Sequence, residues 1–122
     1  MFDHIGIAVS DLAASKGFFV EALAPIGVGV VMEVSDAVGL GQGRKPSFWL
    51  GQAEAQPVPL HLAFTAQNRG QVSEFHRRAL AAGGKDNGPP GLRAHYHAHY
   101  YAAFVIGPDG HNVEVVCHDP HG

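Results

Sequence analysis

The feature that most constrains the fold of this chain is an internal repeat. The stretch that begins at His4 reaches a helix-capping residue, Asp11, after seven residues, and the stretch that begins at His61 reaches another, Asn68, at the same interval. In each half an apolar, strand-like stretch precedes the cap and helix-forming residues follow it. Because a repeat constrains the whole chain, it predicts two equal modules, each ordered strand, helix and three strands. The alternative is an unrelated α+β domain in which the two histidines are placed by coincidence.

The remaining segments complete the two modules. Residues 12–24 carry helix formers and stop at a proline, and the next three strand candidates are VGVVMEV, AVGLGQ and PSFWLG. The stretch QAEAQPVP is polar and proline-bearing, which is typical of a linker. A second helix is expected to run to about Gly83, and YYAAFVIG and HNVEVV form a hairpin around a Pro-Asp-Gly turn. We therefore predict one α+β domain, with module one at 1–52 and module two at 57–119.

Composition excludes several classes of partner. The chain has 8 lysines and arginines against 11 acidic residues, and the basic residues are scattered, so we expect no nucleic acid or membrane partner. No apolar run approaches the length of a membrane helix, and the N-terminus does not resemble a signal peptide. The single cysteine, Cys117, rules out an internal disulfide. A cytoplasmic protein is the expectation that follows.

Three polar residues stand out in apolar strands. His4 and His61 occupy matched positions in the first strand of each module, and Glu114 lies between Val113 and Val115. Singly, such residues are most often just hydrogen-bonded within the protein. Together, two histidines and a carboxylate make a facial ligand set that suits a divalent metal and leaves positions open for water or substrate. A buried glutamate also calls for a cation nearby.

These segments resemble a known family. The stretches DHIGIAVSDLAASKGFF, LHLAF and YYAAFVIGPDGHNVEVVC are similar to the vicinal oxygen chelate superfamily, which includes glyoxalase I, fosfomycin-resistance thiol transferases, methylmalonyl-CoA epimerase, extradiol dioxygenases and bleomycin-resistance proteins. The resemblance covers essentially the whole chain. It implies two βαβββ modules whose curved mixed sheets enclose a metal and substrate cleft. It also implies a homodimer, and a divalent zinc, nickel, manganese or iron ion on His4, His61 and Glu114.

One position departs from the pattern of glyoxalase I. Aligning SFWL on NVEV places Trp49 opposite Glu114 in the repeat, where glyoxalase I usually has a further glutamate ligand. Tryptophan does not ligate metals. The three-ligand pattern of the thiol transferases and dioxygenases remains, but a thiol transferase needs a cationic pocket, for which only Arg44 and Arg93 are candidates. Trp49 is either a wall of the cleft or a plain core residue.

The histidine-rich run RAHYHAHYYAAF, residues 93–104, precedes the last hairpin. A two-residue turn through Pro108 and Asp109 predicts that Ala103 faces Glu114 and that Tyr101 lies diagonally from it. Tyr101 would then orient a substrate oxygen or relay a proton, and His97 would act as a general acid or base at the cleft mouth. A register error of one residue would reverse these facings. The substrate-contact candidates are Trp49, Arg44, His99 and Ala103, although a solvated loop before the strand is the favoured interpretation for His95 and His99.

The leading functional hypothesis is a metal-dependent, glyoxalase-like lyase or isomerase that acts on a small oxygenated substrate chelated to the ion. A dioxygenase or thiol-transferase-like member of the same superfamily is the first alternative. A metal-free protein that binds a small hydrophobic molecule, as in drug resistance, is the second, with walls from Trp49, Tyr100, Tyr101 and Phe104. A dimer that has lost its substrate is the third.

Overall fold

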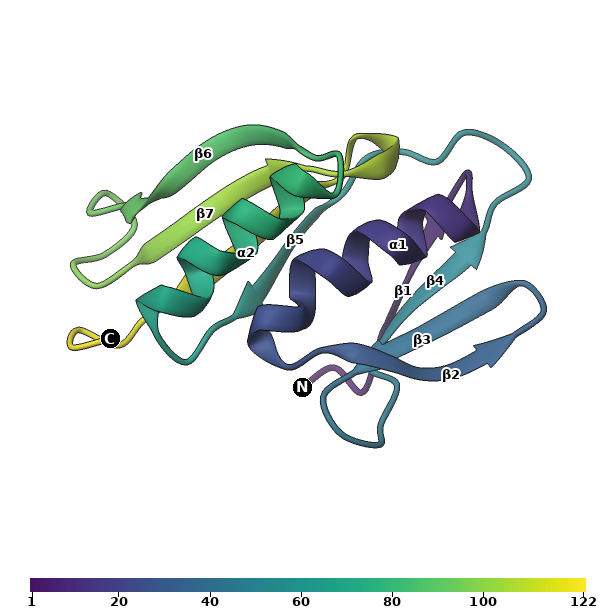
Figure 1. Ribbon diagram of the computed structural model, residues 1–122, viewed down its shortest axis with the longest axis horizontal. Coiled ribbons are helices and arrows are strands. Elements are labelled where there is room, and N and C mark those ends of the chain that lie inside the picture. Colours follow the sequence, from purple (N-terminus) through teal and green to yellow (C-terminus); the bar gives the residue numbers. More distant parts are fainter.

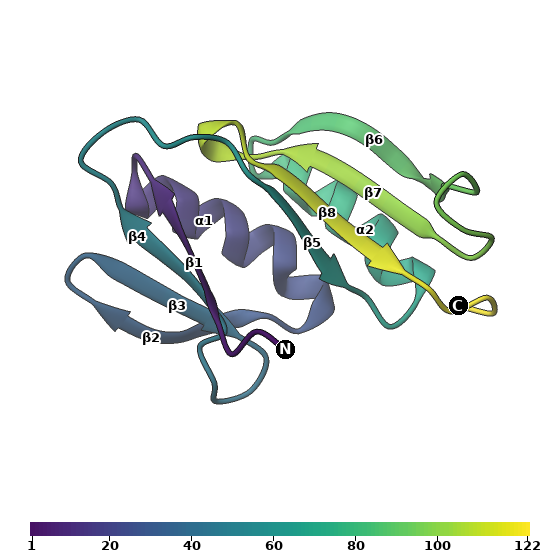
Figure 2. The same cartoon turned by 180° about the vertical axis from the view of Figure 1, so that it is seen from behind.

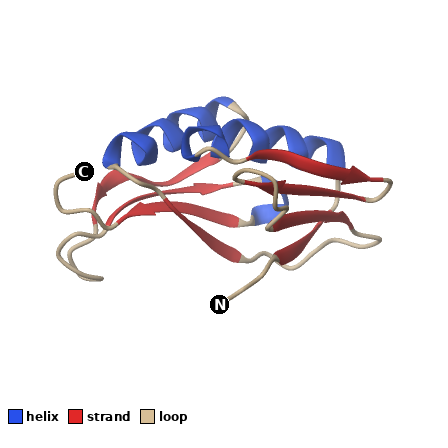
Figure 3. Ribbon diagram, turned by 90° about the horizontal axis from the view of Figure 1, so that it is seen from below, coloured by secondary structure: helices blue, strands red, loops and turns tan.

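The computed structural model describes residues 1–122 and shows a layer of two helices over a layer of strands (Figure 1, Figure 3). Asp11 and Asn68 begin the two helices as N-caps, because their side chains accept hydrogen bonds from the backbone of Ala14 and Gln71. Both predicted caps are confirmed. In chain order the elements are β1 (Ile5–Val9), α1 (Leu12–Leu23), the 3₁₀ turn η1 (Ala24–Ile26), β2 (Gly29–Val34), β3 (Ala37–Gly41), β4 (Phe48–Gln52), β5 (His61–Thr65), α2 (Arg69–Ala81), β6 (Lys85–Leu92), β7 (Tyr101–Ile106), the 3₁₀ turn η2 (Pro108–Gly110) and β8 (Asn112–Cys117).

The strands form two four-stranded mixed sheets with the same topology. Their orders are β1-β4-β3-β2 and β5-β8-β7-β6, and in each sheet the first strand of the module pairs in parallel with its last strand. The other neighbours are antiparallel. This is an α+β fold of two βαβββ modules, as the internal repeat predicts.

The register of the two parallel pairs confirms the alignment of the repeats. Gly6 lies opposite Trp49 in the first module, and Ala63 lies opposite Glu114 in the second. Trp49 and Glu114 therefore occupy equivalent places in their sheets. At this point of the sheet only the second module carries a side chain of a metal-ligand type.

One hydrophobic core fills the space between the helices and both sheets. Alternate residues of every strand except β2 and β6 face this core, as Ile7 and Val9 do in β1, where they are 4% and 0% exposed. Phe19 of α1 and Phe75 of α2 are fully buried in the same cluster. Burial of side chains of this size stabilises the fold by about 1.5–3 kcal/mol each. The core thus joins the two modules into one unit.

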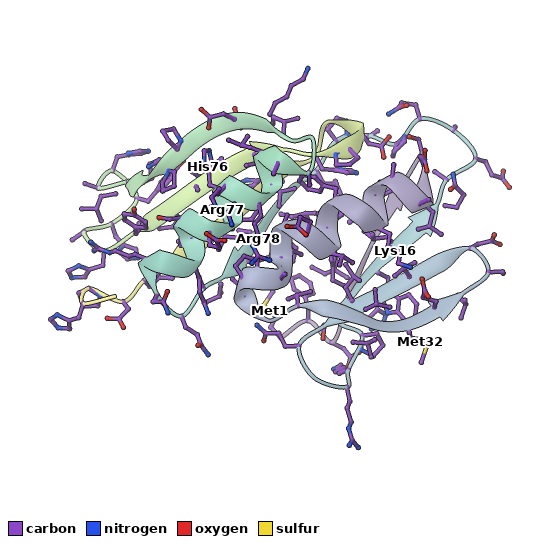
Figure 4. The ribbon with its side chains drawn as sticks, viewed as in Figure 1. Met1, Lys16, Met32, His76, Arg77 and Arg78 are labelled. Atoms are coloured by element: carbon purple, nitrogen blue, oxygen red, sulfur yellow. The ribbon has the colours of Figure 1, made fainter.

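The opposite face of the sheets carries no helix, and we call it the open face. Small residues occupy much of it beside Trp49, and a Cβ atom added to Gly39 would lie 3.0 Å from the Trp49 ring. On the edge strand β2, Met32 and Val34 are 48% and 55% exposed, and Figure 4 shows Met32 at the outer side of this strand. Apolar side chains exposed together on a strand are typical of a surface that another chain covers.

Polar contacts also join the modules. His111, fully buried immediately before β8, accepts a hydrogen bond from the Leu60 backbone N–H at 3.0 Å, and its other ring nitrogen donates to the Ala8 carbonyl at 3.2 Å. Asp109, which has the left-handed φ of 63°, accepts hydrogen bonds from the backbone and hydroxyl of Ser10. Neither helix is both long and apolar enough to cross a membrane.

The two helices contact each other through charged side chains. Arg78 of α2 lies between the helices in Figure 4 and approaches Glu21 of α1 at 4.0 Å, while it also bonds Glu74 on its own helix at 3.1 Å. The Arg77 and Arg78 guanidinium groups hold the pKa of the Glu74 carboxyl down at about 2. These pairs are exposed, so they add little to stability.

Candidate functional site

Glu114 is the centre of the candidate site. It belongs to β8, points to the open face and is 1% exposed. Its Oε1 accepts a hydrogen bond from His61 Nε2 at 2.8 Å, and its Oε2 accepts one from the Tyr100 hydroxyl. A small apolar cluster of Ala102, Phe104 and Val116 surrounds it. A carboxylate in these surroundings is stabilised almost entirely by its two hydrogen-bond donors.

Tyr100 is held as a hydrogen-bond donor. Burial first, and then the hydrogen bond to the Glu114 carboxylate, together raise the pKa of its hydroxyl to about 12. The phenol therefore keeps its proton at neutral pH. His61, by contrast, is half exposed, with 55% of its side chain open to solvent. A substrate can reach the His61 ring, while Glu114 and Tyr100 lie behind it.

The register of the last hairpin differs from the prediction. Phe104, not Ala103, lies opposite Glu114, and Tyr101 lies opposite Cys117. The prediction that Ala103 and Tyr101 share the face of Glu114 is wrong, because η2 adds one residue to the assumed two-residue turn. Ala103 is buried in the core on the helix side, and Tyr101 packs against the same core.

Tyr100 takes the place that the sequence reasoning gave to Tyr101. Tyr101 instead carries the Arg69 guanidinium over its ring, 5.0 Å from the ring centre. The shift of one residue in the hairpin register takes Tyr101 off the face of Glu114 and leaves Tyr100 on it.

His4 lies apart from the His61–Glu114 pair. It precedes β1, its side chain is 58% exposed, and its Nδ1 bonds the Asp3 carboxylate at 2.7 Å. Figure 2 shows why: β1 and β5 run in opposite directions, so their equivalent first residues lie at opposite ends of the gap between the modules. The expectation that the repeat brings His4 and His61 together within one chain is not met.

These positions decide how well one chain fits a divalent ion. The His61 nitrogen and Glu114 oxygen are ligand types that zinc, manganese, nickel and iron accept, and they already converge. No group of three or more histidine, cysteine, aspartate or glutamate side chains lies where it could hold a metal ion. A single chain therefore fits a metal in part, with two donors in place and the third, His4, elsewhere.

A cleft of about 680 Å³ lies between the two modules. His4 and Lys45 line one part of it, His61 another, and Leu40, Phe48 and Phe64 supply apolar lining. The predicted substrate contacts Arg44, Trp49, His99 and Ala103 lie outside this lining, as do Tyr100, Tyr101 and Phe104.

Residues 93–100 of the histidine-rich run form a loop between β6 and β7, so the three histidines do not alternate as in a strand. His97 reaches back to His118, whose Nδ1 lies 2.8 Å from His97 Nε2. His95 contacts the ring of Tyr96, and the side chain of His99 is exposed. The sequence reasoning missed His118 because nothing in its immediate sequence links a residue of the C-terminal tail to the loop.

Two βαβββ modules with a histidine–glutamate pair on the open sheet face define a protein of the vicinal oxygen chelate type. The chain belongs to the Glyoxalase/Bleomycin resistance protein/Dioxygenase superfamily, whose family model matches residues 1–115. The resemblance seen in the sequence is thereby confirmed. No protein among the curated ones matches the chain.

Solved structures share this fold over nearly the whole chain. A glyoxalase/bleomycin resistance protein from Albidiferax ferrireducens T118 is 27% identical, with a TM-score of 0.83 over 98% of this chain and 99% of that one. A glyoxalase/bleomycin resistance protein/dioxygenase family enzyme from Burkholderia phytofirmans PsJN is 17% identical, with a TM-score of 0.75 over 97% and 98%. The oxidase ChaP-H2 is 20% identical, with a TM-score of 0.71 over 98% and 94%. The last two likenesses show the fold alone.

Proposed function

We propose that this protein is a metal-dependent, glyoxalase-like lyase or isomerase that acts on a small oxygenated substrate at the His61–Glu114 pair. The observation that carries the proposal is the 2.8 Å approach of a half-exposed histidine to a carboxylate that is 1% exposed. Burying a carboxylate in an apolar sheet costs free energy, and a bound cation offsets that cost.

Each residue of the chain around this pair has a separate role. His61 faces solvent and presents a ring nitrogen to the substrate side, so it holds an ion or a substrate oxygen. Glu114 supplies the negative charge, and the protonated Tyr100 hydroxyl keeps one carboxylate oxygen fixed in place. A divalent ion, when bound, supplies Lewis acidity that stabilises negative charge developing on a neighbouring substrate oxygen.

We further propose that two copies of the chain complete the metal site. His4, His61 and Glu114 all belong to the open face by the alternation of their strands, yet His4 is too far away within one chain to join the pair. In a twofold dimer with facing open faces, His4 of each copy would serve the pair of the other. The exposed Met32 and Val34 and the small residues around Trp49 support this face as the contact. A cytoplasmic location fits the one unpaired cysteine, Cys117.

Metal analysis of purified protein tests the proposal. Wild-type protein prepared without chelator is expected to carry close to one divalent ion per chain. Glu114→Gln, which keeps the side-chain shape, and His61→Ala are each expected to lose it. Asp86→Asn is the matched control, because Asp86 bonds His76 at 2.9 Å in a similar pair outside the site. Metal-free wild-type protein, or full metal content in Glu114→Gln, would sink the proposal.

A dioxygenase or a thiol-transferase-like enzyme would use the same pair. The transferase is less favoured because Arg44 lies outside the cleft lining, and Arg93 is used in bonds to the carbonyls of Pro89 and Gly91. Redox-active iron in the purified protein, together with oxygen consumption, would favour the dioxygenase over the lyase or isomerase.

Metal-free binding of a small apolar molecule is the second candidate function. It is favoured by one observation, the cleft of about 680 Å³ with its apolar lining of Leu40, Phe48 and Phe64. A substitution such as Phe64→Ala would then weaken ligand binding, and a chelator would leave that binding unchanged. Loss of binding on chelator treatment would exclude this function.

A further inference from the structure

Two histidines that the proposed reaction leaves unused lie beside Tyr100. His97, in the loop between β6 and β7, and His118, just after β8, have ring nitrogens 2.8 Å apart. Their rings are stacked, with centres 4.9 Å apart and an angle of 24° between the planes. The two residues come from segments 21 positions apart in the chain, so this contact holds the loop against the C-terminal tail.

A neighbouring backbone group fixes where the hydrogens of this pair lie. The His99 backbone N–H donates to His97 Nδ1 at 3.1 Å, so that nitrogen carries no hydrogen. In the neutral ring the hydrogen is then on Nε2, which donates to Nδ1 of His118. Both rings are therefore neutral and each has a defined tautomer.

The two histidines form part of the packing around the Tyr100 side chain. The Tyr100 ring makes T-shaped contacts with both histidine rings, and its centre lies 5.6 Å from that of His97 and 5.3 Å from that of His118. The centre of the Tyr96 ring lies 4.8 Å from that of Tyr100. The Tyr100 backbone also donates to the His97 carbonyl at 3.2 Å. These contacts aim the Tyr100 hydroxyl at Glu114. Loosening the pair would release the tyrosine from two of its three ring neighbours.

The charges around the pair make its neutral state essential. No carboxylate lies within ion-pairing distance of His97 or His118, since the only histidines with such partners are His4, His61 and His76. The groups that contact the pair are the Tyr100 ring and the His99 backbone, and Glu114 lies beyond the Tyr100 hydroxyl. An added proton would thus be uncompensated, and it would break either the His97–His118 bond or the bond from the His99 backbone.

We infer that His97 and His118 are positioning residues that act as a neutral pair to hold the Tyr100 hydroxyl on Glu114. The inference rests on the proposed function in one respect, that Glu114 is the working carboxylate. His97 acts here through Tyr100 rather than as a general acid or base on the substrate.

The test uses proton NMR of the whole protein. The Tyr100 hydroxyl proton, identified by its disappearance in Tyr100→Phe, reports the bond to Glu114 directly. In His97→Leu this proton is expected to exchange with water about tenfold faster, which is the change expected when the hydrogen bond from the Tyr100 hydroxyl to Glu114 is lost. His97→Gln keeps an N–H that donates to His118, so it is expected to restore slow exchange.

Two controls separate this role from a general loss of structure. His99→Ala removes a side chain in the same loop but keeps the backbone N–H that bonds His97, so it should behave as wild type. His118→Leu should match His97→Leu, and imidazole ¹⁵N spectra should show the His97 hydrogen on Nε2. Unchanged hydroxyl exchange in His97→Leu, or a hydrogen on His97 Nδ1, would overturn the inference. Metal content is a separate measurement, so failure of the metal proposal is seen independently.

Discussion

His61 and Glu114 are joined by a 2.8 Å hydrogen bond between neighbouring parallel strands, β5 and β8. The bond is diagonal, because Ala63 rather than His61 lies directly opposite Glu114 in the pairing. The small Ala63 side chain leaves room for the histidine ring to turn toward the carboxylate. The pair therefore depends on strand register, and the residues that fix the register and the donors are the ones to test.

Removal of the Tyr100 hydroxyl is expected to destabilise the fold. In Tyr100→Phe the buried Glu114 carboxylate keeps only the His61 donor, and an unmet buried acceptor costs about 1–3 kcal/mol. Chemical denaturation at neutral pH measures the loss in unfolding free energy. Tyr101→Phe is the matched control, because Tyr101 faces the helices and makes no hydrogen bond to Glu114. Equal effects of the two substitutions would contradict the assignment of Tyr100.

The raised pKa of Tyr100 also predicts a dependence on alkaline pH. The folded state holds this proton more tightly than the unfolded chain does, since burial and Glu114 raise the pKa from its usual 10.0 to about 12. The stabilisation is therefore complete below about pH 10 and is lost as the pH rises toward 12. Unfolding free energies measured across this range should fall more steeply for wild-type protein than for Tyr100→Phe. Parallel slopes would contradict the prediction.

Asp109 predicts the opposite dependence, in acid. Burial raises its pKa, but the hydrogen bonds from Ser10 and Gln56 outweigh burial and hold the pKa below its usual 3.8. A lowered pKa means that the stabilisation is present above about pH 4 and is lost as the pH falls through the folded-state value. Asp109→Asn, which tolerates the left-handed backbone, should unfold in acid with a shallower slope than wild-type protein. An unchanged acid transition would show that this link between modules adds nothing.

His111 is expected to matter for stability rather than for function. His111→Leu leaves the Leu60 N–H and the Ala8 carbonyl without their partner at the junction of the modules. A cost of about 1–3 kcal/mol is expected for each buried group left unpaired. Thermal or chemical denaturation measures it, with His121→Leu in the C-terminal tail as the control. A loss no larger than that of the control would count against a bridging role.

Much of the fold follows from the sequence because its signals are local and occur twice. The caps at Asp11 and Asn68, the spacing of the core residues and the equivalence of Trp49 with Glu114 need only the repeat and strand alternation. Strand β6 does not follow from the sequence, because its proline-bearing stretch NGPPG lacks a strand pattern. Because β6 lies at the edge of its sheet, it can contain prolines, which edge strands accept.

The site was less predictable because it depends on features that are not local. The turn η2 holds one residue more than the simplest hairpin, and this alone exchanges Tyr101 for Tyr100 as the neighbour of Glu114. The position of His4 depends on the opposite directions of β1 and β5, which the repeat does not state. The contact of His97 with His118 depends on the path of a loop, and a loop has no periodic sequence pattern from which its path could be predicted.

Metal recovery in mixed dimers tests the shared site most directly. His4→Ala and Glu114→Gln are each expected to bind no ion alone. After joint refolding, each mixed dimer should regain one intact site of its two, because one copy supplies His4 and the other supplies His61 and Glu114. A mixture of His61→Ala with Glu114→Gln should regain none, since both residues belong to the same half-site. Recovery of metal in the first mixture alone is the predicted result. No recovery in the first mixture, or equal recovery in both, would contradict the account.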